Sequence, residues 1–153
     1  MAIGYISHHD CQLHDMGHHH PEQPARLSAI NDRLIASGLE MILHQFDSVP
    51  VTRAQLEAVH DLAYIDSIYA AAPSEGLVWI DGDTAMNPHT LRAAELAAGA
   101  VALGVDLVMQ GRVRQVFCVT NLALAPIAGT KTSEGLANRK NRATLGWCPL
   151  FDS

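Results

Sequence analysis

Apolar residues recur along the first 120 positions in short runs that alternate with longer helical stripes. Residues 2–7, 41–46 and 113–120 are short apolar runs, each typical of a strand. Between the first two, apolar residues recur at helical spacing over residues 27–35, and Gly38 stands where that helix should end. Because strands and helices alternate, the pattern predicts an α/β fold with a parallel sheet and flanking helices.

Two further helices are expected before residue 73. Thr52 and Gln55 match a capping box, in which each side chain binds the other's free backbone N–H, so a helix should run from there to His60. A second helix is expected over residues 62–72, ended by Pro73.

The longest helix is expected to start at Asn87 or Thr90 and to end at Gly111. Its alanines, Gly99 and Gly104 leave one flank narrow, so the helix should lie close to a sheet or to another helix. Its apolar positions Leu91, Ala94, Ala98, Val101, Val105 and Val108 recur three and four residues apart, and the helix is expected to be buried on more than one side. Beyond residue 120 the periodicity weakens, and residues 121–153 are expected to be mostly loop.

Composition limits the class of protein. With 153 residues the chain has the length of one ordinary domain, so residues 1–153 are expected to form a single domain. Hydrophobic residues make up 48% and charged residues 17%, a balance typical of a folded chain. A net charge of −6 without a dense Lys/Arg stripe argues against nucleic-acid binding.

The cellular compartment is inferred from the lack of a membrane span or signal peptide and from the pattern of cysteines. No apolar run approaches the roughly 18 residues of a membrane span, and the first ten residues do not resemble a signal peptide. Cys11, Cys118 and Cys148 are an odd number at no regular spacing, which favours buried thiols over a disulfide framework. A soluble, cytoplasmic protein with neither nucleic acid nor membrane as a partner is therefore expected.

The stretch from His8 to Leu27 holds six of the nine histidines together with Cys11. It follows the carboxyl end of the first predicted strand, which is the end where ligands bind in open α/β sheets. A metal or substrate loop and a histidine-rich approach to the next helix both fit this composition.

An ordered set of motifs along the chain resembles the N-terminal portion of the histone deacetylase family. The motifs are HPEQPARL at residues 20–27, Val59-His60 followed by Tyr64-Ile65, Asp83-Thr84 before the long helix, and Phe117-Cys118 in the last predicted strand. The resemblance covers about residues 1–120 and is closest to the bacterial deacetylase-like amidohydrolases, acetylpolyamine deacetylases and acetoin-utilisation proteins.

The resemblance implies a zinc-dependent arginase–deacetylase fold that removes acetyl groups from lysine or polyamine nitrogens. After the strand at 113–120, however, the family carries an Arg-Pro-Pro-Gly-His-His segment, whereas this sequence continues from Asn121 with LALAP, and its last histidine is His89. The zinc ligands of the family, an Asp-x-His pair and a second Asp, belong to later strands. We therefore expect a truncated arginase–deacetylase-type sheet with a divergent tail at 121–153.

Two candidate sites remain in the loop. Cys11, His14 and His20 are spaced so that they could bind a structural zinc, as residues of this loop do in some deacetylases. The favoured interpretation is that these are ordinary loop residues and that no cofactor is bound. The resemblance also places a set of residues at the mouth of the acyl-lysine channel. We expect these residues to keep a structural role, with Glu22 bound to Arg26, rather than to bind a substrate. These rim residues are His20, Pro21, Glu22, Asp83 and Thr84.

Two functions are compatible with these observations. The leading one is a non-catalytic deacetylase-like protein, which we expect to form a homo-oligomer because a sheet cut partway leaves a strand edge and apolar helix faces to cover. The alternative is a hydrolase, a deacetylase or esterase of small acyl substrates, with a site built from the loop at residues 8–20 in one chain or across a subunit interface. The sequence does not identify the small-molecule ligand.

Overall fold

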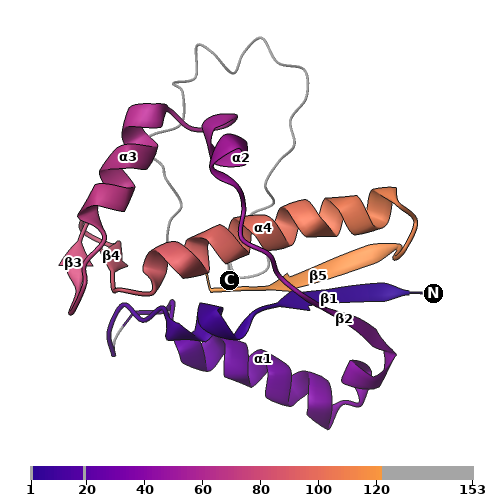
Figure 1. Cartoon of the computed structure of the whole chain (residues 1–153). Coiled ribbons are helices and arrows are strands. Elements are labelled where there is room, and N and C mark those ends of the chain that lie inside the picture. The colour runs from indigo at the N-terminus through magenta and orange to yellow at the C-terminus, as the bar shows by residue number, and fades with distance from the viewer. Residues whose placement is uncertain (1, 19, 122–153) are drawn as a thin grey trace.

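A parallel sheet of three strands forms the centre of the structure, a computed structural model that describes residues 2–18 and 20–121 (Figure 1). The strands are β1 (Ile3–Ser7), β2 (Leu43–Asp47) and β5 (Gln115–Val119), in the order β2-β1-β5. Tyr5 on β1 stands opposite Gln45 on one side and Phe117 on the other. The predicted α/β fold with a parallel sheet is confirmed.

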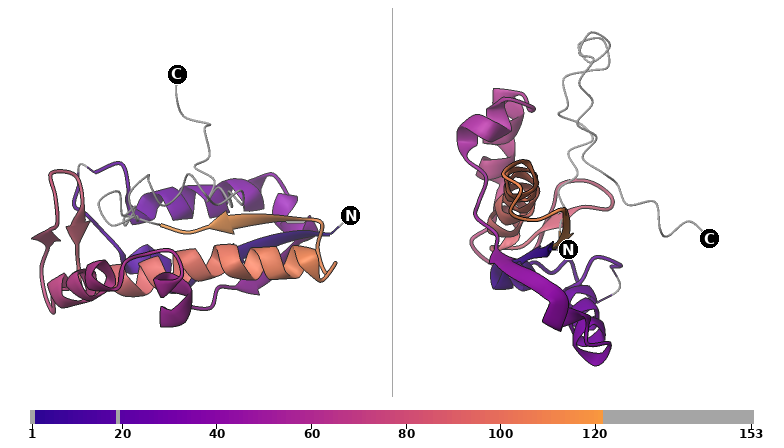
Figure 2. Two further views of the ribbon diagram at one scale, coloured as in Figure 1. Left: turned by 90° about the horizontal axis from the view of Figure 1, so that it is seen from above. Right: turned by 90° about the vertical axis from the view of Figure 1, so that its right-hand side faces the viewer.

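Helices cover both faces of this sheet (Figure 2). Because successive side chains of a strand point to opposite faces, Tyr5 packs in a cluster with Leu27 of α1 (Pro24–Ala36), and Ile6 packs with Ala100 and Leu107 of α4 (Thr90–Met109). The helix α1 starts at a proline, as predicted, and Gly38 follows its C-cap with a left-handed φ of 70°.

The buried face of α4 is its narrow flank, made largely of small residues. The helix is not buried along the whole predicted apolar stripe, because Val101, Val105 and Val108 are exposed by 39%, 57% and 39%. The small residues are buried because they let the helix axis approach the sheet closely. The buried residues of α4 are Thr90, Ala93, Leu96, Ala97, Gly99, Ala100, Gly104 and Leu107.

A second backbone segment crosses α4 on the way out of the sheet. After β2, the buried Ser48 donates its hydroxyl to the carbonyl of Leu96 at 2.6 Å, and the N–H of Val51 donates to the carbonyl of Glu95 at 2.9 Å. At the crossing, a Cβ on Gly99 would lie 1.7 Å from the carbonyl oxygen of Val49. Only glycine fits there.

The crossing leads into an arm of two short helices and a small hairpin. These are α2 (Arg53–Glu57), α3 (Leu62–Ala71), β3 (Val78–Trp79) and β4 (Ala85–Met86), the last two antiparallel. The capping box of Thr52 and Gln55 is present with both of its hydrogen bonds, but α2 ends before the predicted His60. The pairing of β3 with β4 was not predicted, because each of these strands is only two residues long.

Several boundaries also differ from prediction. The His-rich loop contains a 3-10 helix, η1 (His9–Leu13), and a second one, η2 (Leu39–Ile42), precedes β2. The side chain of Phe117 on β5 is 46% exposed, so this strand is less buried than predicted. Residues 122–153, and with them most of the predicted tail, lie outside the described part. No helix in the described ranges is long and apolar enough to cross a membrane.

We predict that Gly99→Ala lowers the free energy of unfolding by about 1–3 kcal/mol, the usual range for overpacking. Alanine in an exposed helix would raise stability by roughly 0.5–1 kcal/mol, so the clash with the Val49 carbonyl must reverse the sign. Urea denaturation measures the change.

The matched control is Gly104→Ala, whose Cβ would meet a movable side-chain atom, Val116 Cγ1, at 3.1 Å. We expect a smaller loss for this variant than for Gly99→Ala. A Gly99→Ala protein as stable as the wild type would show that the crossing is looser than described.

Candidate functional site

The His-rich loop begins at the carboxyl end of β1 and is folded locally by η1. His8 is the N-cap of η1, and its Nδ1 accepts a hydrogen bond from the N–H of Asp10 at 3.1 Å. The N–H of Cys11 donates to the carbonyl of His8 at 3.1 Å, and the Cys11 side chain is fully buried, as predicted for a thiol. Burial raises the pKa of that thiol, so it is a poor nucleophile.

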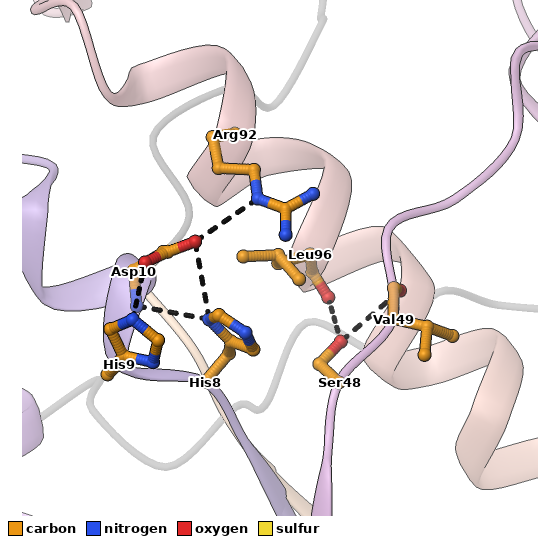
Figure 3. Close-up of polar contacts among 7 residues, drawn as sticks. All are labelled: His8, His9, Asp10, Ser48, Val49, Arg92 and Leu96. Atoms are coloured by element: carbon orange, nitrogen blue, oxygen red, sulfur yellow. Dashed lines mark hydrogen bonds and ion pairs between the residues drawn. The ribbon is translucent and has the colours of Figure 1, made fainter.

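Asp10 joins two histidines to the first turns of α4 (Figure 3). Its Oδ1 lies 2.8 Å from Nε2 of His9, its Oδ2 lies 3.6 Å from Nδ1 of His8, and Arg92 donates from Nε to Oδ2 at 3.2 Å. The hydrogen bond from Arg92 is the main reason that the pKa of Asp10 is lowered. Sequence reasoning missed this group, although the run HHD directly after a strand was a usable signal.

His14 anchors the loop to the start of α4. Its ring is fully buried, and its Nδ1 lies 2.8 Å from Oγ1 of Thr90. On either side of it, the side-chain amide of Asn87 donates to the carbonyl of Leu13 at 2.8 Å, and that of Asn121 donates to the carbonyl of His14 at 3.2 Å. Two distant segments, residues 87–90 and Asn121, therefore hold this one turn of chain.

The hydrogen-bond pattern around Thr90 assigns the tautomer of His14. The hydroxyl of Thr90 donates to Oδ1 of Asn87 at 3.0 Å and accepts from the N–H of Asn87 at 2.8 Å. Nδ1 of His14 must then carry the proton and donate, and Nε2 is an acceptor that is buried without a partner among the described residues. Desolvation accordingly lowers the pKa of His14; Asp15 acts against this shift and His20 adds to it.

The predicted rim residues lie at the far end of the loop, and the structure brings two of them together. Nε2 of His20 lies 3.3 Å from Oδ1 of Asp83, whose side chain is 95% exposed. Nδ1 of His20 accepts from the N–H of Glu22 at 3.1 Å, and Arg26 donates to Oε1 of Glu22 at 3.4 Å, the pair that the sequence predicted. Burial raises the pKa of Glu22 against the opposing effect of Arg26.

The other two rim residues make no contact of this kind. The N–H of Thr84 donates to Oδ1 of Asp81 at 2.8 Å, which closes the turn between β3 and β4. Pro21 lies between His20 and Glu22 and is exposed.

The structure does not gather the predicted zinc candidates Cys11, His14 and His20 into one ligand set. Within residues 2–18 and 20–121, the only three His, Cys, Asp or Glu side chains with ligand atoms all within 4.8 Å of one another are His8, His9 and Asp10. The ring of His14 is instead bound to Thr90.

The catalytic zinc of the arginase–deacetylase fold does not fit the residues described either. Such a site needs at least three protein ligands and an open position. No Asp-x-His sequence occurs anywhere in the chain, and Asn121, the first residue after Thr120, binds the loop through its amide.

Comparison with known proteins identifies the family. The sequence model of the histone deacetylase domain matches residues 20–123. The chain belongs to the histone deacetylase family. This match covers most of the region in which the motifs were found, and it includes the rim residues.

A solved structure agrees with this assignment. The structure titled "Crystal Structure of HDA15 HD domain" is similar to this chain with a TM-score of 0.72 and 26% sequence identity. The alignment covers 78% of this chain and 35% of that domain, so the chain spans about a third of the deacetylase domain that it resembles. The arginase–deacetylase-type arrangement predicted from the motifs is thereby confirmed for the aligned part.

We predict that the free energy of unfolding falls as the pH drops below about 6.5, the ordinary pKa of histidine. The pKa of His14 is lower in the folded state, so the unfolded chain takes up a proton at a pH where the folded chain does not, and acid therefore favours unfolding. The stability that comes from this difference is complete above pH 6.5. Urea denaturation at pH 7.5 and at pH 5.5 measures the change.

His14→Gln should reduce this pH dependence, because it removes the buried titrating ring. The matched control is His44→Gln on β2, where the ring is exposed, and it should keep the wild-type dependence. Equal pH dependence in the two variants would contradict the role given to His14.

Proposed function

We propose that residues 2–121 form the channel-mouth part of a deacetylase-type domain and have no hydrolytic centre of their own. The chain would then be a non-catalytic, self-associating member of the family. The observation behind the proposal is the position of Asn121, which follows the last described strand. It stands where the family carries its histidine-containing segment, and it is fully buried with its amide bound to the loop.

The rim supports the same proposal. His20 and Asp83, from segments 63 residues apart, meet at the surface and can border a channel. Glu22 is engaged by Arg26 and His14 by Thr90, so neither extends the His20–Asp83 pair into a larger catalytic set. A rim of this kind can bind an acyl chain or a partner domain without cleaving a bond.

A bacterial relationship and a cytoplasmic location complete the proposal. The motif HPEQPARL supports the bacterial amidohydrolase branch. Cys11 and Cys118 are unbonded thiols, which supports a reducing compartment.

The second candidate function is a hydrolase with a site built from the loop at residues 8–20. The observation in its favour is the close approach of His8, His9 and Asp10. Against it, Asp10 already binds Arg92, so the carboxylate that would orient a histidine is shared with a guanidinium.

We predict that the purified full chain, supplied with zinc, releases acetate from an acetyl-lysine reporter, and acid from an acyl-ester reporter, no faster than buffer does. The reason is that the chain has no Asp-x-His sequence and carries Asn121 where the family has its histidine-containing segment. A metal-stripped sample is the control. Zinc-dependent turnover that His14→Ala or His20→Ala abolishes would refute the non-catalytic proposal and favour the hydrolase.

We also predict a homo-oligomer at micromolar concentration. Val105 and Met109 on α4 are 57% and 80% exposed, and β5 pairs only with β1 in the part of the chain that the structure describes. A second copy is the partner that is always present to cover such surface. Light scattering or analytical ultracentrifugation measures the mass, and a stable monomer would contradict the prediction.

A further inference from the structure

The group formed by His8, His9 and Asp10 has the composition and spacing of a metal site. Nitrogen and oxygen atoms bound to one zinc-sized ion at about 2.0–2.2 Å lie roughly 3–3.5 Å from each other. In this group, Nε2 of His9 is 2.8 Å from Oδ1 of Asp10, and Nδ1 of His8 is 3.6 Å from Oδ2. The rings of His8 and His9 are stacked, with their centroids 4.5 Å apart, so one ring must rotate before both nitrogens point at the same ion.

The surrounding structure holds these residues in place. His8 caps η1, and the buried Cys11 fixes the same turn against the core. Arg92 binds Oδ2 of Asp10 from α4 and leaves Oδ1 turned toward His9 (Figure 3). Ligating carboxylates are commonly held by such an outer hydrogen bond.

The site is open to solvent on one side and borders a cavity on the other. The side chain of His9 is 82% exposed, whereas those of His8 and Asp10 are 15% and 22% exposed. The cavity of about 260 Å³ lies at the carboxyl ends of the strands, where ligands bind in open α/β sheets. Its polar lining includes Ser7, Gln12 and Asp47 as well as both histidines.

Two features set the strength of binding. The guanidinium of Arg92 repels a cation at Asp10, and Nδ1 of His8 must give up the hydrogen bond that it accepts from the N–H of Asp10. Both features oppose metal binding, so the ion should bind weakly and exchange readily, unlike a zinc ion held by four protein ligands in a structural site.

We propose that His8, His9 and Asp10 bind a divalent transition-metal ion, with zinc or nickel as the type of ion that two imidazoles and a carboxylate prefer. This site differs from the Cys11, His14 and His20 set, and it does not depend on the proposed function. Three protein ligands leave coordination positions free for water or for an anionic ligand in the cavity.

The test is a calorimetric titration of the full chain with zinc, in a background that carries His18→Ala, His19→Ala and His20→Ala. The background is needed because three consecutive histidines bind metals themselves. We expect one ion per chain, and at least a tenfold loss of affinity on adding either His9→Ala or Asp10→Asn. Cobalt can replace zinc in a parallel titration, in which the visible absorption of the ion reports its ligands.

The matched control is His44→Ala, which removes another exposed histidine and should leave affinity unchanged. Because His9 is largely exposed, His9→Ala should not disturb the fold, and circular dichroism checks this. The proposal is overturned if the background binds no zinc, or if binding survives both His9→Ala and Asp10→Asn.

Discussion

The close approach of α4 to two other backbone segments is the constraint on which the rest of the structure depends. Small residues on one flank of α4 let the sheet lie against it, and Gly99 lets the segment after β2 cross it at backbone contact. The position of α4 in turn fixes Thr90 and Arg92, which hold the His-rich loop. Side chains that carry no chemistry therefore determine where the polar groups of the loop lie.

The histidines of the loop differ in chemistry because their surroundings differ. His14 is buried and neutral, with one ring nitrogen bound to a hydroxyl. His20 lies beside a carboxylate at the surface, and His8 and His9 share the carboxylate of Asp10 with an arginine. The loop thus combines a structural anchor with groups still free to bind a ligand.

Much of the fold followed from local pattern. The parallel sheet, α1, the capping box of Thr52 and the rim pair of Glu22 and Arg26 depend on neighbours in the sequence or on strong periodicity, and all were predicted. The motif resemblance likewise named the family that the comparisons support.

What could not be predicted depends on distant partners. The valines of α4 were expected to be buried because of their apolar spacing, whereas the close approach of other backbone segments buried the flank of small residues instead. The role of His14 required knowing that Thr90 and Asn121 converge on it, and nothing local in the sequence indicates that. The Asp10 cluster had a local signal in the run HHD, but Arg92, which holds Asp10 in place, lies 82 positions later.

The long separation of the loop from its anchors has a consequence for how the chain folds during synthesis. The ring of His14 binds Thr90, 76 positions later, and the carbonyl of Leu13 binds Asn87, 74 positions later. The carbonyl of His14 binds Asn121, 107 positions later. Closing such large loops carries an entropic cost that short-range contacts do not. While the ribosome makes the first eighty residues, β1 and α1 can form, but His14 lacks Thr90 and Asn121, the residues that anchor it. The His-rich loop is therefore one of the first segments to be translated and one of the last to become ordered.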